Sequence, residues 1–178
     1  MQRILVALAV LSAAIHVHAA SPLEAHFAAD PGQKVDAWYG EQIARYTTDP
    51  SFNTQLTDYL PASDTVPSPA KALGDVSGAP NMLPRLETVH DYFRSLAASS
   101  PRVKVFSIGQ SEEGREMLAV AIADESLLAD LEGNRERLAQ LADPRRIGLD
   151  DERAAKLIEQ SVPVYYITGT IHSNETGT

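Results

Sequence analysis

The feature that most constrains the fold is a run of β-branched and aromatic residues near the end of the sequence, Val162–Thr170. The run has little polar alternation, so it suits a strand covered on both faces rather than one with a solvated face. Pro163 is tolerable because it stands at the start of this strand. A strand of this kind needs neighbours on both sides, so we expect it to lie inside a helix-covered sheet.

The residues before this run predict a helix followed by two strands. Apolar residues at three- and four-residue spacings indicate an amphipathic helix with Pro84 in its first turn, ended by Pro101. Two short strands, Val103–Ile108 and Met117–Ala123, are expected next, joined by a polar turn.

Residues 125–160 are expected to be helical, with a break at Asp143-Pro144 and with Asp150 as the N-cap of a second helix. The order of helix, two strands, helical crossover and buried strand indicates the α/β class.

The N-terminal segments differ from the periodic region. Residues 1–19 have a positive start, an apolar run of about a dozen residues and small residues before a cleavage point, which predicts a secretory signal peptide. The alternative is an uncleaved membrane anchor, but the run is short of the ~20 residues that a membrane-spanning helix needs. Residues 20–83 form a Pro-rich lead-in, either ordered against the following domain or a flexible linker.

Composition excludes several classes of protein and partner. The net charge is −9, from 15 basic and 24 acidic residues, so we expect no nucleic-acid partner. Beyond the signal no stretch is apolar enough for a bilayer, so no membrane association is expected after cleavage. Without cysteine there are no disulfides and no thiolate ligands, and any metal must be held by His, Asp or Glu. We expect a secreted or periplasmic protein.

Two candidate metal ligands, His172 and Glu175, directly follow the predicted buried strand. Ligands in open α/β sheets bind at the carboxyl ends of strands, and imidazole nitrogen and carboxylate oxygen are both good zinc ligands. The alternative is a hydrogen bond between these two side chains that holds a loop. The reversed spacing, Glu87 and His90, is interpreted as a solvated pair on a helix face.

The turn between the two predicted strands carries a second motif, Ser107–Glu116, which contains two glycines and Glu113-Gly114-Arg115. The glycines permit a tight reversal, and Arg115 can lock the turn through a carboxylate or carbonyl, or alternatively contact a substrate. This segment resembles the Gly-x-Ser/Thr-x-Glu-Gly-Arg signature of funnelin-type zinc carboxypeptidases. Tyr165–Glu175 resembles the zinc motif that follows it in that family. The resemblance covers about residues 84–178.

The resemblance implies a cofactor, a fold and a partial site. It implies Zn²⁺ bound by His172 and Glu175, in the N-terminal part of a mixed-sheet, three-layer domain whose sheet is incomplete here. The family's third ligand, a His, and its Glu general base lie further downstream, and the 178 residues hold no counterpart of either. Asn174 stands where several members have Arg, which leaves the substrate subsite open.

The functional expectation is therefore a secreted zinc metallocarboxypeptidase that hydrolyses the C-terminal bonds of peptide or protein substrates. Residues 84–178 are expected to be the N-terminal part of its peptidase domain, truncated and inactive by itself; a natural short protein is the alternative. Two other functions stay open: a zinc-dependent amidase or deacylase of the same fold, and a non-catalytic secreted binding module.

Overall fold

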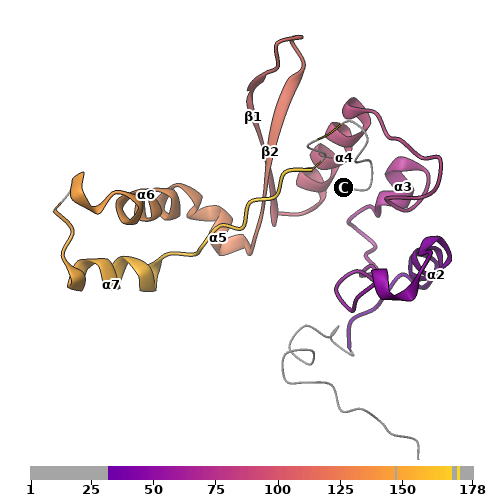
Figure 1. Cartoon of the computed structure of the whole chain (residues 1–178), viewed down its shortest axis with the longest axis horizontal. Helices are drawn as coiled ribbons and strands as arrows, with labels where there is room; N and C mark the ends of the chain where they lie inside the picture. Colours follow the sequence, from indigo (N-terminus) through magenta and orange to yellow (C-terminus); the bar gives the residue numbers. More distant parts are fainter. Residues whose placement is uncertain (1–31, 147, 170–171, 173–178) are drawn as a thin grey trace, which may run out of the picture.

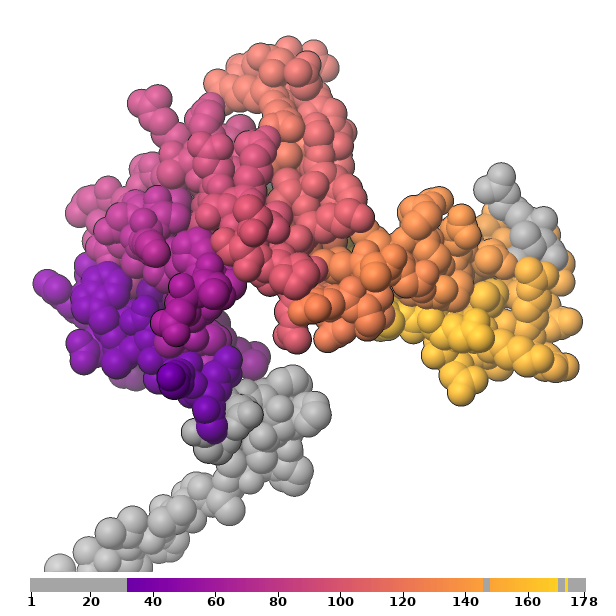
Figure 2. Space-filling view, turned by 180° about the vertical axis from the view of Figure 1, so that it is seen from behind, coloured from indigo at the N-terminus to yellow at the C-terminus, as the bar shows by residue number. Residues whose placement is uncertain are grey.

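The structure is a computed structural model, which describes residues 32–146, 148–169 and 172. Its parts follow one another along an elongated molecule (Figure 1). The lead-in and helix α4 lie on one side of a β-hairpin, and an arm of helices extends from the hairpin's base to the other side. The view from behind shows the same separation of the arm from the body (Figure 2).

The described part of the lead-in contains short elements around a small core. They are α2 (Ala37–Tyr46), the 3-10 helix η1 (Pro50–Phe52) and α3 (Pro69–Leu73). Tyr39, Val76 and Ala79 are buried and make up this core. The Tyr39 hydroxyl accepts a hydrogen bond from the Ser77 N–H at 3.1 Å, which ties α2 to the chain after α3. The predicted domain boundary at residue 84 stays a prediction.

Helix α4 (Leu86–Ser99) is the predicted amphipathic helix, and it ends before Pro101 as expected. Pro84 lies just outside it, because Arg85 is the N-cap rather than a residue of the first turn. The Tyr92 hydroxyl donates to the Pro67 carbonyl oxygen at 3.1 Å, so this helix contacts the lead-in.

Strands β1 (Val103–Gln110) and β2 (Glu116–Ile122) form an antiparallel pair, which confirms the two predicted strands. The register is irregular between Ser107 and Gly109. Gly109 and Gly114 have φ values of 119° and 74°, a left-handed backbone that favours glycine. The predicted reversal is therefore confirmed at Gly114, whereas Gly109 lies inside β1 at the irregular register rather than in the turn.

The arm consists of α5 (Glu125–Ala129), α6 (Leu131–Ala142), the 3-10 turn η2 (Pro144–Arg146) and α7 (Asp151–Gln160). The helical prediction for this region and its break at Asp143-Pro144 are confirmed. The Asp150 side chain accepts from the Arg153 N–H at 2.8 Å, so it is the N-cap of α7 as expected.

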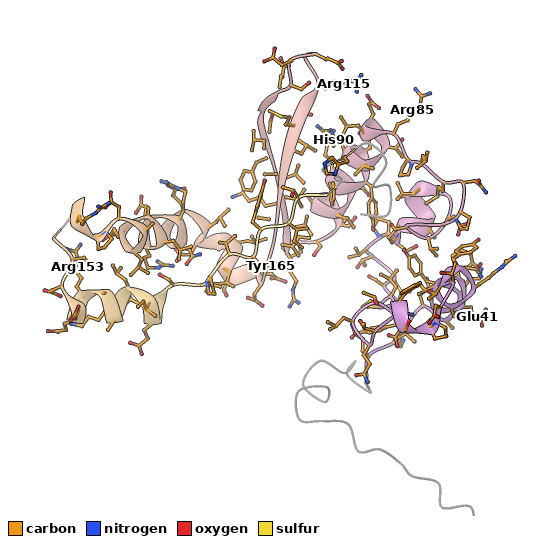
Figure 3. The ribbon with its side chains drawn as sticks, in the orientation of Figure 1. Glu41, Arg85, His90, Arg115, Arg153 and Tyr165 are labelled. Atoms are coloured by element: carbon orange, nitrogen blue, oxygen red, sulfur yellow. The ribbon has the colours of Figure 1, made fainter. Side chains whose placement is uncertain are left out.

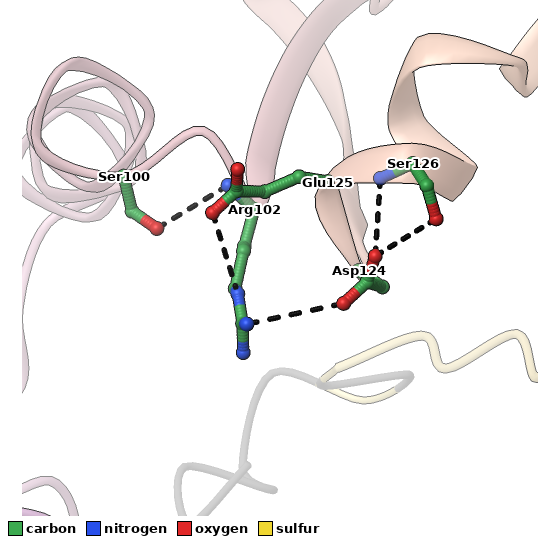
Figure 4. Close-up of polar contacts among 5 residues, drawn as sticks. All are labelled: Ser100, Arg102, Asp124, Glu125 and Ser126. Atoms are coloured by element: carbon green, nitrogen blue, oxygen red, sulfur yellow. Dashed lines mark hydrogen bonds and ion pairs between the residues drawn. The ribbon is translucent and has the colours of Figure 1, made fainter.

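The arm is attached to the hairpin at its base (Figure 4). The Ala123 N–H donates to the Arg102 carbonyl oxygen at 3.2 Å. The Arg102 guanidinium lies 3.8 Å from carboxylate oxygens of both Asp124 and Glu125. These ion pairs are exposed and weak, so the backbone contact and the capping of α5 define the junction.

The main difference from the sequence-based expectations concerns the buried strand predicted at Val162–Thr170. Residues 161–169 contain no helix or strand, and the sheet among the described residues is two-stranded. Val164, Tyr165, Tyr166 and Ile167 are between 70% and 89% exposed. A β-prone sequence becomes a strand only when another strand pairs with it, and the described residues supply none here. The α/β prediction with an incomplete sheet is confirmed by the helices and the hairpin.

Among the described residues, no helix has both the length and the apolar character required to cross a membrane. The predicted signal peptide, residues 1–19, lies outside the described part of the chain.

Candidate functional site

The predicted metal ligands lie at the end of the described chain. His172 is exposed and follows the extended segment 161–169, whereas Glu175 lies outside the described residues. The pairing of His172 with Glu175 therefore stays a prediction. Among the residues that the structure describes, no group of three or more His, Cys, Asp or Glu side chains could hold a metal ion.

The donor types of the predicted pair fit zinc. An imidazole nitrogen and a carboxylate oxygen are two of the three protein ligands of a His₂Glu catalytic site. The described residues do not complete that set, so the fit rests on the chemistry of His172 and Glu175.

The segment that leads to His172 is anchored where it leaves the arm. The Asn134 side chain on α6 is 8% exposed, and it makes two hydrogen bonds to the backbone of Val162. Its Oδ1 accepts from the Val162 N–H at 2.8 Å, and its Nδ2 donates to the Val162 carbonyl oxygen at 2.9 Å. From there the segment, on which Tyr165 is labelled, crosses the lower part of the hairpin in the view of Figure 3 and extends toward α4.

Sequence reasoning missed Asn134, although a signal was present. Asn134 lies three residues after Leu131 and four before Leu138, so it shares the inward face of α6 with both leucines. A polar residue on an apolar helix face requires a buried hydrogen-bond partner. The identity of that partner was not readable, because Val162 is 28 positions away.

The signature turn at the hairpin tip is closed by its own polar groups. The Ser111 N–H donates to the Arg115 carbonyl oxygen at 2.8 Å, and the Gly114 N–H to the Ser111 carbonyl oxygen at 2.9 Å. Arg115 Nη2 lies 2.9 Å from a Glu113 carboxylate oxygen. Arg115 is therefore paired with a carboxylate of the same turn, as the structural interpretation predicts.

A shallow groove of about 590 Å³ lies between α4 and the hairpin tip. His90 faces it from α4, and Glu112, Arg115 and Met117 line it from the hairpin (Figure 3). His90 is half-buried here, whereas Glu87 is exposed. Arg94 of α4 pairs with Glu116 of β2 across the same interface. Helix α4 also contacts β1, so packing rather than this exposed ion pair is expected to hold the helix against the hairpin.

Helices, an antiparallel hairpin and the signature turn together define a fragment of an α/β carboxypeptidase-like domain. Residues 89–178 match the model of a family described as zinc carboxypeptidase. Since this match covers half of the 178 residues, the chain belongs to the zinc carboxypeptidase family. Neither the curated proteins nor the solved structures give a match. At the level of the family, membership indicates a metallopeptidase that acts on peptide or protein substrates.

Proposed function

We propose that this chain is the N-terminal part of a zinc-dependent metallocarboxypeptidase, in which His172 and Glu175 hold the zinc ion. The observation that carries the proposal is the family match over residues 89–178, which includes both the signature turn and these two residues. When bound, zinc supplies a Lewis acid that polarises a peptide carbonyl and activates water for hydrolysis.

Residues of the hairpin and of α4 make polar contacts in the part of the chain before the proposed metal ligands. Arg94 of α4 pairs with Glu116 of β2, and Arg115 pairs with Glu113 within the hairpin turn; both pairs are solvent-exposed, so each adds little stability by itself.

A polypeptide of these 178 residues is proposed to be inactive by itself. It contains two of the family's zinc ligands and no histidine after His172. Catalysis by zinc peptidases requires a complete ligand set and a positioned base in one geometry. Its mature form is proposed to be secreted or periplasmic, starting at Ala20 or Ser21. Mass spectrometry of exported protein that still carries Met1 would contradict the export proposal.

The metal proposal is tested by zinc calorimetry on the 178-residue chain, with His172→Ala and a matched control, His90→Ala. Two ligands form an open site, so binding should be far weaker than at a complete His₂Glu site. We expect His172→Ala to abolish this binding and His90→Ala to leave it unchanged. Tight binding that His172→Ala does not alter would place the ligands elsewhere, with His26 and His90 as the next candidates.

Activity is tested on blocked dipeptides with added zinc, with the double variant His172→Ala/Glu175→Ala as control. The expected result is no release of C-terminal residues by either chain. Chelator-sensitive release by the wild-type chain alone would overturn the inactivity proposal and require a third ligand from within this sequence or from a second chain.

A further inference from the structure

The segment that follows the arm carries backbone groups without partners among the described residues. Residues 161–169 contain no helix or strand. Ser161 and Val162 bond to the arm, whereas Pro163–Gly169 make no hydrogen bond within the described part of the chain. In Figure 1 the yellow chain runs without an arrow from the arm toward α4. Its N–H and C=O groups are therefore open to pairing with a further strand.

The side chains of the same stretch are exposed and prefer β-structure. Val164, Tyr165, Tyr166 and Ile167 are between 70% and 89% exposed. β-Branched and aromatic residues of this kind are enriched in strands. A neutral, β-prone stretch without proline, such as Val164–Thr168, pairs readily with another extended chain when it is exposed.

Charge indicates where two copies of this chain can meet. The net charge is −9, so two copies repel each other in general. Residues 160–169 contain no Asp, Glu, Lys or Arg, so this repulsion has no local source there. The hairpin strands, by contrast, carry the charged residues Lys104 and Glu116, and charged side chains oppose pairing at a sheet edge. The most suitable partner for the segment is therefore the same segment of a second copy.

We propose that Val164–Thr168 is a self-association site, at which two copies of this chain pair as antiparallel strands about a two-fold axis. Each copy then presents the same residues to the other. With the axis at Tyr166, this residue lies opposite its own counterpart, and Tyr165 lies opposite Ile167. Aromatic pairs and pairs of an aromatic with a β-branched residue are favourable across strands.

The area available to this contact predicts weak association. A tyrosine buries roughly 150 Å² or more when it is covered, so the tyrosines of two copies offer about 600 Å². With Val164, Ile167 and the backbone, the total approaches about 1,000 Å², the low end for a specific interface. We therefore expect a reversible dimer with a Kd on the order of 0.1 mM.

The test is sedimentation equilibrium of the 178-residue chain over a range of concentrations around this Kd. The variants are Tyr166→Lys and Tyr166→Glu, each of which places two like charges opposite each other at the axis. The matched control is Phe52→Lys, because Phe52 is 76% exposed and Tyr166 is 77% exposed. Phe52 lies in the 3-10 helix η1 of the lead-in, outside the proposed site.

We expect the wild type and Phe52→Lys to dimerise equally. Each Tyr166 variant should raise the Kd about ten-fold, through like-charge repulsion and the lost contact between aromatic rings. An equimolar mixture of Tyr166→Lys and Tyr166→Glu should associate more tightly than either variant alone, because opposite charges then meet at the axis. In the wild type, hydrogen exchange should slow with protein concentration at alternate amides from 164 to 168, as in an antiparallel ladder.

Four results would overturn the proposal. The first is a wild type that stays monomeric at about ten times the expected Kd. The second is association that persists in Tyr166→Lys, which would locate the contact elsewhere, residues 1–19 included. The third is association that both Tyr166 variants lose and their mixture does not restore, which would assign the segment another partner surface, such as the hairpin edge. The fourth needs no variant: exchange at 164–168 that does not depend on protein concentration.

Discussion

The hairpin and the segment 161–169 are both rich in β-forming residues, but only the hairpin is paired. Strand β1 pairs with β2 along its length, and Val105 lies opposite Val120. In the other segment no strand is formed, and Tyr165 is 89% exposed. Composition therefore does not distinguish the two regions.

The difference lies in how each region obtains a partner. In the hairpin, the five residues Ser111–Arg115 separate the two strands, and Gly114 supplies a left-handed backbone within this turn. Closing so short a loop costs little entropy. No neighbouring strand within a short loop is described for 161–169, and its hydrogen bonds to the arm are those of Ser161 to the end of α7 and of Val162 to the side chain of Asn134. A strand is thus defined by its neighbour as much as by its own residues.

The largest expected effect comes from breaking the turn of the hairpin with Gly114→Val. Gly114 has φ 74°, and a Cβ placed there meets no atom within 4 Å, so the cost is backbone strain rather than a clash. We expect the hairpin to be destabilised by about 2 kcal/mol, because L-residues are disfavoured in this region and β-branched ones most of all. The measurement is native-state hydrogen exchange of the amides in β1 and β2.

Gly114→Asn is the control for this prediction, since asparagine tolerates the left-handed region better than valine. It should lose much less stability. Equal losses in the two variants would show that the backbone angle at Gly114 does not control the hairpin.

A smaller effect is expected when the same substitution is made in the two regions. The variants to compare are Val120→Ala in β2 and Val164→Ala in the unpaired segment. Val120 is half-buried and packs opposite Val105, whereas Val164 is 70% exposed. The first change should cost about 1 kcal/mol through lost burial and a lost cross-strand contact. The second should stay within about 0.5 kcal/mol. Urea unfolding of both variants measures the two costs, and a larger loss in Val164→Ala would mean that the segment is packed in solution.

The parts of the fold that could be predicted are those with local causes. The reversal at Gly114 and the cap at Asp150 each depend on residues close together in sequence, so local sequence patterns identify them. The state of 161–169 and its anchor at Asn134 depend on contacts between residues far apart in sequence. Periodicity reports which face is apolar, but it does not report which distant segment covers that face.

The candidate site likewise has one part that the sequence predicts and another that depends on distant contacts. His172 and Glu175 were identified by a short motif and its resemblance to a family, which needs no knowledge of distant contacts. The groove beside His90 was missed, because it arises from the packing of α4 against the hairpin tip. The polar residue on the apolar face of α6, Asn134, could have indicated a buried contact between the arm and a distant part of the chain.

The smallest expected effect concerns the junction between the hairpin and the arm, where Asp124 caps α5. The pKa of Asp124 is lowered, first by the hydrogen bond from the Ser126 N–H, then by the Ser126 hydroxyl and to a lesser extent by Arg102; partial desolvation opposes these effects. Because the folded pKa lies below the unfolded value near 3.8, the cap stabilises the junction above that pH and is lost as the pH falls through the folded pKa. We expect hydrogen exchange at the Ser126 amide, corrected for its intrinsic pH dependence, to lose protection below about pH 4. Asp124→Asn keeps an oxygen acceptor without a titrating group, so its protection should vary less with pH. If that variant retains the full pH dependence, the Asp124 carboxylate does not control the protection of the Ser126 amide.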